Sequence, residues 1–310
     1  MSASRGTRLR GANNVRVLVT GASGFLGGAV CAELLERGHH VAALVRRPGS
    51  EPAGTTAVAG DLADANSLRR ALGSAEPEAV VHLAAEIASQ RDPKKIDEAN
   101  VEGTRRLLAA SEAAGVRRLL FTSTVVTGDA KGALLNEETP LPVETAYGRS
   151  KQKGEQLLAD SSLEGVVIRP SHVYGPGGWF AEEFIARLRQ PGRFAVIGSG
   201  QNCWDVVRVE DVASACVDAL ERAPAGAIYH VADDEPIRFR DFVGLAAEAL
   251  GTGPPRSVPV WIARLIAGRD AVAAVTRSAR SSNAKIKSEL GWEPRFPSAR
   301  EGVPDAIAKL

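Results

Sequence analysis

Residues 15–27 read Val-Arg-Val-Leu-Val-Thr-Gly-Ala-Ser-Gly-Phe-Leu-Gly, a β-branched apolar run followed by glycines at every third position. Leu26, Val30 and Leu34 then share one face of a helix. A strand, a glycine turn and a helix in this order are typical of dinucleotide sites, because pyrophosphate binds the free N–H groups at a helix N-terminus. The stretch therefore predicts the first strand and helix of a Rossmann-type fold.

Each glycine has a steric role in such a turn. Gly21 would make the tight turn, Gly24 would let the backbone approach phosphate, and Gly27 would let the helix pack closely on the strand. A glycine repeat alone is weak evidence, since glycines commonly serve only to make turns. The flanking strand and helix favour the dinucleotide interpretation.

Apolar runs of strand type alternate with helical patterns over the first half of the chain. They lie at 15–20, 40–45, 79–84, 117–123 and 165–169. The alternation predicts an α/β fold with a doubly wound parallel sheet covered on both faces. After about residue 171 the segments are shorter and richer in glycine and proline, which predicts a smaller, mostly C-terminal lobe that binds substrate.

Composition narrows the class of protein. The 310 residues are 44% hydrophobic with a formal net charge of +1, so the chain can bury a large core and offers no electrostatic case for nucleic-acid binding. No apolar stretch approaches the roughly 20 residues that span a bilayer, so we expect no membrane partner. Residues 1–14 are basic with no apolar segment after them, which predicts a flexible tail rather than a signal peptide or an anchor.

The three cysteines, Cys31, Cys203 and Cys216, are odd in number and lack the spacing of metal ligands. Reduced thiols in a cytoplasmic protein, with no metal site, are the simplest interpretation. None of the three has the surroundings of a nucleophile.

Tyr147 and Lys151 are candidates for proton transfer. They are four residues apart, so on a helix they lie on one face about one turn from each other. A free phenol titrates near pH 10, and a neighbouring cation would favour phenolate and lower that pKa toward the working range. A solvated Tyr and Lys on an exposed helix would have the same spacing. Their place after a cofactor turn favours the catalytic interpretation and a hydride-transfer enzyme.

With these motifs the chain resembles an extended short-chain dehydrogenase/reductase of the NAD(P)-dependent epimerase/dehydratase group, from about Val15 to the C-terminus. Further landmarks follow in the family's order, namely Gly60-Asp61-Leu62, His82-Leu83-Ala84-Ala85, Asn100-Val101-Glu102-Gly103-Thr104, Arg169-Pro170, Val173-Tyr174-Gly175-Pro176-Gly177, Ser282-Asn283-Ala284-Lys285 and Leu290-Gly291-Trp292.

The resemblance implies the domain organisation and the partners. We expect a Rossmann domain at 15–170 and mainly a substrate-binding lobe at 171–310, with segments near 205–231 returning to the Rossmann side. A small-molecule substrate is implied, and a homodimer is an expectation from the resemblance only.

The resemblance also implies the chemistry. Hydride would pass between the nicotinamide and a carbinol or ketone carbon, while Tyr147 exchanges the proton on oxygen and Lys151 holds the nicotinamide ribose. Asn100 is expected to support the active-site helix. Asp61 and Leu62 correspond to contacts with adenine, and Ala84 and Ala85 to the path beside the cofactor.

The third catalytic residue depends on the alignment of Phe121-Thr122-Ser123-Thr124-Val125-Val126-Thr127-Gly128, which is one residue shorter than the commonest spacing in the family. An insertion or deletion is better tolerated in a loop than in a strand, so we anchor the alignment on the strand. This selects Thr124, whose hydroxyl would bind the substrate oxygen. Ser123 is the alternative, and either hydroxyl could instead cap a loop.

The end of the second strand bears on the cofactor. NAD sites commonly place an acid there to hold the ribose 2′-hydroxyl, whereas arginine accommodates a 2′-phosphate. Here Val45 takes the place of the acid, and Arg46 and Arg47 follow. Guanidinium pairs well with phosphate, so NADP is favoured over NAD, although two solvated loop arginines would look the same.

Two departures from the family bear on the substrate. Relatives that act on nucleotide sugars usually have Asn and Arg where this chain has His172 and Trp204. The changes remove expected nucleotide-diphosphate contacts, and Trp204 adds an aromatic surface. His172 could equally be a packed core histidine.

The candidate cofactor residues are Gly21, Ser23, Gly24, Phe25, Leu26, Gly27, Arg46, Arg47, Asp61, Leu62, Ala84, Ala85, Asn100, Thr122, Tyr147, Lys151, Pro170, His172 and Val173. The candidate substrate contacts are Glu86, Thr124, His172, Trp179 and Trp204.

These residues favour an NADP-dependent ketone reductase or alcohol dehydrogenase that acts on a small non-nucleotide molecule. The first alternative is a nucleotide-sugar epimerase or dehydratase with transient redox of the cofactor. The second is a non-catalytic NADP(H) sensor, which would not need Tyr147 and Lys151.

Overall fold

A computed structural model describes residues 14–87, 90, 92–190, 192 and 194–310. All of the predicted flexible tail except Asn14 lies outside the described residues.

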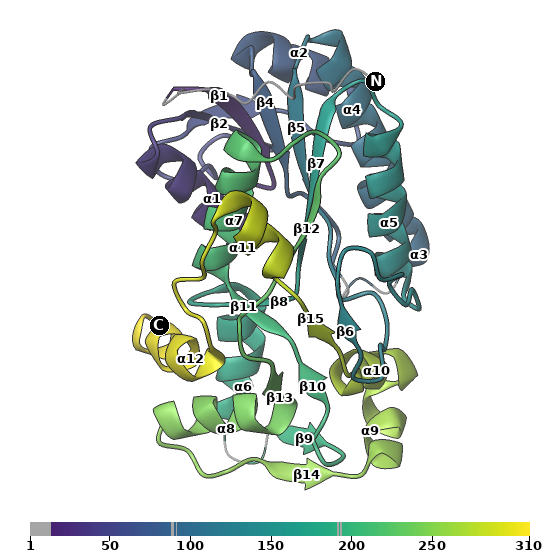
Figure 1. Ribbon diagram of the computed structural model, residues 1–310, viewed down its shortest axis with the longest axis vertical. Helices are drawn as coiled ribbons and strands as arrows, with labels where there is room; N and C mark the ends of the chain where they lie inside the picture. The colour runs from purple at the N-terminus through teal and green to yellow at the C-terminus, as the bar shows by residue number, and fades with distance from the viewer. Residues whose placement is uncertain (1–13, 88–89, 91, 191, 193) are drawn as a thin grey trace.

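Seven parallel strands form the main sheet, in the order β12–β7–β5–β4–β1–β2–β3 (Figure 1). They are β1 (Arg16–Thr20), β2 (His40–Val45), β3 (Thr56–Ala59), β4 (Ala79–His82), β5 (Arg118–Thr122), β7 (Glu164–Pro170) and β12 (Ile228–Val231). The predicted Rossmann-type doubly wound fold is therefore confirmed. The chain reverses its direction across the sheet between β1 and β4, and such a switch point is where open α/β sheets bind ligands.

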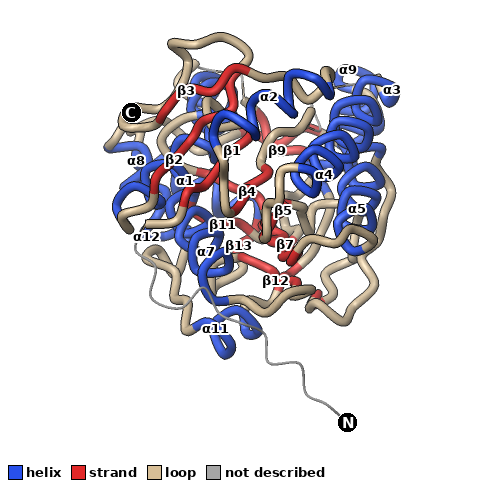
Figure 2. The backbone as a smooth tube through the Cα atoms, turned by 90° about the horizontal axis from the view of Figure 1, so that it is seen from above, coloured by secondary structure: helices blue, strands red, loops and turns tan. Residues whose placement is uncertain are grey.

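Helices cover both faces of the sheet, as the view from above shows (Figure 2). Those that flank it are α1 (Phe25–Glu36), α2 (Ala65–Ala75), α4 (Gly103–Ala113), α5 (Ala146–Ala159), α7 (Val209–Arg222) and α11 (Ala284–Leu290). Alternate side chains of β1 feed the two cores, because successive residues of a strand point to opposite faces. Val17 and Val19 pack with α1 and α7, whereas Leu18 packs with α2 and α4.

A second lobe lies beyond the carboxyl ends of the strands (Figure 1). Its core is a group of buried aromatic side chains that includes Tyr174, Phe180, Trp204 and Phe242. Short strand pairs build its framework: β6 (Leu134–Leu135) with β15 (Arg280–Ser281), β8 (His172–Tyr174) with β11 (Val206–Arg208), β9 (Ala195–Ile197) with β14 (Arg256–Val258), and β10 (Cys203–Trp204) with β13 (Ile237–Arg238).

The remaining elements are short helices and the helices of the lobe. They are α3 (Pro93–Asp97), the π-helical segments η1 (Glu98–Glu102) and η2 (Phe180–Ile185), α6 (Ala186–Leu188), α8 (Phe239–Ala249), α9 (Val260–Ala267), α10 (Arg269–Thr276) and α12 (Ala299–Ala308). Within the described ranges, every helix is too short or too polar to cross a membrane.

Candidate active site

The glycine turn joins β1 to α1 at the switch point of the sheet. Gly21 has a φ of +71°, and a Cβ there would lie 2.7 Å from the backbone nitrogen of Ala84. A Cβ on Gly27 would lie 2.0 Å from the carbonyl oxygen of Gly21. The helix begins after Gly24, which offers no side-chain cap, so its first N–H groups face the turn. A cradle that a single methyl group would fill fits the pyrophosphate of a dinucleotide.

The catalytic candidates lie on α5, opposite this turn across the end of the sheet. The helix begins at Ala146 because the hydroxyl of Thr145 accepts a hydrogen bond from the backbone N–H of Gly148 at 2.9 Å. This start places Tyr147 in the first turn, half-buried, and Lys151 in the second, 2% exposed. The Lys151 Nζ atom lies 4.5 Å from the ring centroid of Phe121 on β5.

The pKa of Tyr147 differs from the expectation that Lys151 lowers it. Burial raises the pKa of Tyr147 to about 12, because removal of the phenol from water disfavours its charged form. Burial also lowers the pKa of Lys151 to about 8, and the carboxylate of Glu155 opposes this shift. At neutral pH, Tyr147 therefore holds its proton and Lys151 is mostly charged. This is the state of a pair that donates a proton to a substrate oxygen.

Asn100 ties the catalytic helix to the loop after β4. Its side-chain amide donates to the hydroxyl of Ser150 and to the carbonyl of Glu86, both at 2.9 Å. The backbone N–H of Glu86 returns a bond to Asn100 Oδ1 at 2.7 Å. Ser150 in turn donates to the carbonyl of Tyr147 at 2.8 Å. Because the side chain of Asn100 is bound to the protein on each side, its position fits the support of α5 rather than direct chemistry.

A buried histidine that was not predicted as a site residue holds the same region. His82 Nδ1 lies 2.7 Å from Thr20 Oγ1, and its Nε2 lies 2.8 Å from Thr104 Oγ1. Thr104 donates its proton to the carbonyl of Asn100, so His82 Nε2 must donate to Thr104 and Nδ1 must accept from Thr20. Burial and the charge of Lys151 lower the pKa of His82 to about 3, so this ring stays neutral.

The two candidate hydroxyls differ in their partners. Thr124 Oγ1 donates to the carbonyl of Pro170 at 3.2 Å and accepts from the N–H of Val126 at 2.9 Å. The hydroxyls of Ser123 and Thr122 are buried and have no hydrogen-bond partner among the described residues. The hydroxyl of Thr124 is therefore bound to backbone groups, whereas the hydroxyl of the adjacent Ser123 is free to donate a hydrogen bond.

The residues expected at the adenosine end lie at the ends of β2 and β3. Val45 is 3% exposed, and the side chains of Arg46 and Arg47 are exposed and form no ion pair with any described residue. Asp61 Oδ1 accepts the N–H of Ala63 at 2.9 Å, which holds this carboxylate close to its own loop. Leu62 packs against Gly103 at the start of α4.

Phe25 packs on the turn at 175–178, and Ala84 N–H bonds the hydroxyl of Thr20 at 3.3 Å. Ala85 is half-buried beside Ala84 in the loop that follows β4, and Ser23 is exposed in the glycine turn. Leu26 is partly buried against the core on the α1 side of the sheet, so it packs the helix rather than facing the turn.

The predicted substrate contacts do not all face one site. His172 Nδ1 lies 3.0 Å from the carbonyl of Asp205, and its ring stacks on Trp204 at a centroid distance of 4.3 Å. Trp204 is only 5% exposed, because it packs in the core of the lobe and is covered on one face by His172. It therefore does not offer the aromatic surface that was expected. Trp179 is half-buried and donates to the carbonyl of Val173 at 2.7 Å. Glu86 contacts the site through its backbone, and its side chain is exposed.

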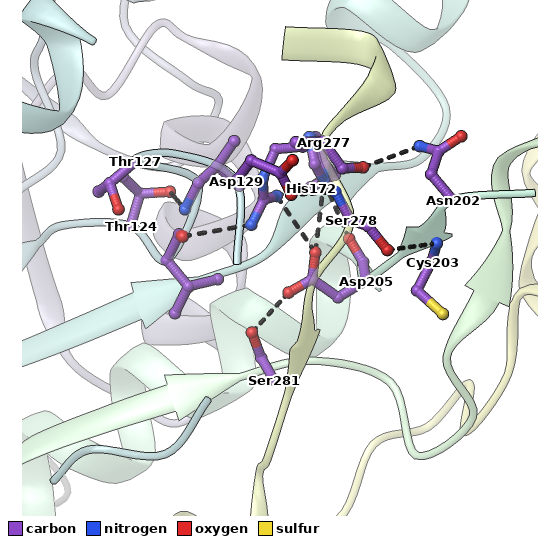
Figure 3. A network of polar contacts seen from close by, with 12 residues as sticks. Thr124, Thr127, Asp129, His172, Asn202, Cys203, Asp205, Arg277, Ser278 and Ser281 are labelled. Atoms are coloured by element: carbon purple, nitrogen blue, oxygen red, sulfur yellow. Dashed lines mark hydrogen bonds and ion pairs between the residues drawn. The ribbon is translucent and has the colours of Figure 1, made fainter. Parts of the chain in front are cut away.

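A buried ion pair joins the lobe to the loop at 123–128, which follows β5, and no sequence motif predicted it (Figure 3). Arg277, between α10 and β15, lies with its Nη1 3.3 Å from Asp205 Oδ1, and the two side chains are 3% and 2% exposed. Arg277 also donates to the carbonyls of Gly128 at 3.1 Å and Val125 at 3.4 Å. Ser281 donates to the other carboxylate oxygen of Asp205. Arg277 therefore fixes the loop after Thr124, and its charge is already neutralised within the protein.

Known proteins are similar to this chain in sequence and in fold. The profile of the NAD dependent epimerase/dehydratase family matches residues 17–232. A 3-diazoavenalumate denitrifying reductase from a Streptomyces species is 33% identical over 302 residues, 93% of this chain and 99% of the relative. A 2-alkyl-3-oxoalkanoate reductase from Stenotrophomonas maltophilia is 34% identical over 254 residues, 76% of each chain.

Among solved structures, the UDP-glucose 4-epimerase of Thermus thermophilus in complex with NAD superposes with a TM-score of 0.82 at 28% identity. The match covers 95% of this chain and 98% of that one. Together with the matched profile, these similarities show that the chain belongs to the NAD-dependent epimerase/dehydratase family of extended short-chain dehydrogenases/reductases.

Proposed function

We propose that this protein is an NADP-dependent reductase that converts a ketone of a small non-nucleotide molecule to a secondary alcohol. The observation that carries the proposal is the placement of Tyr147 and the buried Lys151 in successive turns of α5, where Tyr147 keeps its proton at neutral pH and can give it to a carbonyl oxygen. Both curated relatives described above bear the names of reductases.

The roles of the residues follow from their positions. A bound nicotinamide cofactor supplies the hydride. Tyr147 donates its proton to the substrate oxygen, and a second hydroxyl donates to the same oxygen as negative charge develops there. This is Thr124, which must first release the carbonyl of Pro170, or its neighbour Ser123, whose hydroxyl has no partner among the described residues. Lys151 binds the ribose hydroxyls and keeps a positive charge close to Tyr147. Asn100 and Ser150 hold the helix that carries both residues.

A non-nucleotide substrate is supported by the state of Arg277. A diphosphate requires cations or N–H donors that are free to pair with it. The guanidinium of Arg277 is already paired with Asp205 and bound to two carbonyls, and the neighbouring Trp204 carries no charge. The arrangement around His172 therefore favours a non-nucleotide substrate over a nucleotide sugar.

Preference for NADP rests on Arg46 and Arg47. We expect the Arg46→Gln/Arg47→Gln variant to raise KM for NADPH by about 10-fold or more and to leave KM for NADH nearly unchanged, because only the phosphate loses charge-assisted bonds. Steady-state kinetics with both cofactors measures this, with Arg70→Gln as a control on another exposed arginine. An equal change for both cofactors would show that the two arginines do not read the 2′-phosphate.

The second candidate function is a nucleotide-sugar epimerase or dehydratase, which the close superposition on a UDP-glucose 4-epimerase favours. Turnover of the cofactor separates the two functions. A reductase consumes one NADPH for each ketone reduced, whereas an epimerase interconverts UDP-glucose and UDP-galactose with no net consumption of NADPH. A panel of aliphatic and aromatic ketones assayed beside these two sugars tests the proposal. Sugar conversion without NADPH consumption would overturn it.

A further inference from the structure

A partly buried ion pair lies one helical turn beyond Lys151. Arg169 on β7 donates to Glu155 on α5 through two parallel bonds, Nε to Oε1 at 2.9 Å and Nη2 to Oε2 at 2.6 Å. Both side chains are 11% exposed. A forked pair of this kind fixes the orientation of the carboxylate as well as its charge.

Glu155 pairs with Arg169 and not with the lysine on its own helix. Glu155 follows Lys151 by four residues, and oppositely charged side chains at this helical spacing commonly pair with each other. Among the described residues, Lys151 forms no ion pair, and its ammonium lies over Phe121 instead. Arg169 thus takes the carboxylate that would otherwise hold Lys151.

We propose that Arg169 and Glu155 position Lys151 for the cofactor. Arg169 holds the carboxylate of Glu155 away from the ammonium of Lys151, which leaves this ammonium free to bind ribose. The negative charge of Glu155 nevertheless remains near Lys151. The inference rests on the proposed function only for the identity of the ligand. Arg169 and Glu155 are positioning residues, because they act through Lys151.

The other titratable groups near Lys151 do not supply a negative charge to it. Tyr147 and His82 are neutral at pH 7, the latter with a pKa lowered to about 3. On the neighbouring α3 and η1, Asp97 pairs with Lys153 and Glu98 pairs with Arg106 at exposed positions.

On the far side of the pair, Arg169 Nη1 lies 3.5 Å from His230 Nε2. Burial and the charge of Arg169 lower the pKa of His230 to about 4, so this ring is neutral as well. Glu155 is therefore the carboxylate that opposes the effect of burial on Lys151.

The two single variants should shift the pKa of Lys151 in opposite directions. In Glu155→Gln the negative charge is lost and Arg169 is left unpaired, so the pKa of Lys151 should fall by about one unit from its value of about 8. In Arg169→Gln, Glu155 is released to pair with Lys151, so this pKa should rise by a similar amount. Affinity for the cofactor should then fall by about 10-fold, since the ammonium is diverted from the ribose.

The experiment measures the Lys151 pKa by NMR titration of protein labelled with ¹³C at lysine Cε, with the signal assigned from Lys151→Met. Titration of NADPH binding between pH 6 and pH 9 gives the affinities. The matched control is Lys153→Gln, on the same helix as Lys151, which breaks the exposed ion pair with Asp97 of α3. It should change neither the Lys151 pKa nor the affinity for NADPH. Arg169→Lys, which keeps the charge and loses the fork, should lie between wild type and Arg169→Gln.

Opposite shifts in the two single variants support the inference, provided that the double variant Glu155→Gln/Arg169→Gln shows the same lowered pKa as Glu155→Gln, because Arg169 acts on Lys151 only through the carboxylate. Shifts of the same sign, or loss of affinity with an unchanged Lys151 pKa, overturn it and leave a purely structural pair. If a single variant does not fold, the double variant and Arg169→Lys replace it. A lowered Lys151 pKa in the first and a raised one in the second support the inference, and shifts of the same sign overturn it. The readouts need no turnover, so a protein that proves not to reduce ketones would leave this result standing.

Discussion

Replacing Tyr147 with phenylalanine should lower kcat by about 10²–10⁴-fold while affinity for NADPH stays close to that of the wild type. The substitution removes the proton donor and keeps the ring. With its pKa raised to about 12, the phenol is the form present throughout the neutral range. Single-turnover oxidation of NADPH in the presence of a ketone measures the chemical step, and a binding titration measures the affinity.

Tyr229→Phe is the matched control for this variant. Its hydroxyl donates to Glu289 at 2.8 Å, which lies on α11 away from the site, so activity should be unchanged. If Tyr147→Phe is as active as Tyr229→Phe, the proton comes from another group, and Tyr147 is a structural residue of the helix.

Replacing Arg277 with methionine should destabilise the protein by about 3–5 kcal/mol, because Asp205 is then left buried without its cation. The carboxyl pKa of Asp205 is held below its ordinary value by His172 and Arg277, against the effect of burial. The ionised Asp205 therefore stabilises the fold at pH values above the pKa that this carboxyl has in the unfolded chain. That stabilisation is lost as the pH falls through its pKa in the folded protein. The deficit of the variant should therefore shrink as the pH falls from 7 to 4, because Asp205 can then bind a proton. Urea unfolding at both values measures it.

The double variant Arg277→Met/Asp205→Asn separates the lost ion pair from lost packing. Removal of both charges should recover much of the deficit at pH 7, since no uncompensated charge remains. Arg187→Met, which breaks an exposed pair with Glu183, should cost about 1 kcal/mol or less. A deficit in Arg277→Met that is the same at both pH values and persists in the double variant would assign the loss to packing.

The parts of the fold that could be predicted from the sequence are those encoded by short stretches. The strands that form β1, β2, β4, β5 and β7 are apolar runs buried between two layers of helices, and periodicity identifies such runs directly. The strand β3 was missed because Thr56–Ala59 is short, only half-buried and at the edge of the sheet. A strand of four residues that are all exposed or half-buried carries little pattern to detect.

The site could be predicted only where its residues are close in sequence. The glycine turn and the pair of Tyr147 with Lys151 are local motifs, whereas Arg277 and Asp205 are 72 residues apart and meet only in the folded chain. Spacing also predicted the wrong direction for the Tyr147 pKa. The spacing places a lysine one helical turn away, but it does not report that the phenol is buried, and burial raises its pKa. The expectation that Trp204 offers an aromatic surface to the substrate was wrong for a similar reason. Its burial depends on Phe239 and Phe242, which are distant in sequence.

The position of β12 has a consequence for the order in which the chain can fold. This strand pairs with β7, and α7 packs on α1, so residues after the first part of the lobe complete a sheet begun near the N-terminus. During synthesis, the outer edge of β7 has no neighbour until residue 231 has left the ribosome. An unpaired parallel edge is a template for other chains, and contacts this distant in sequence form slowly. The nascent chain therefore carries the unpaired edge of β7 while residues 171–227 are being made, and that interval ends when β12 pairs with β7.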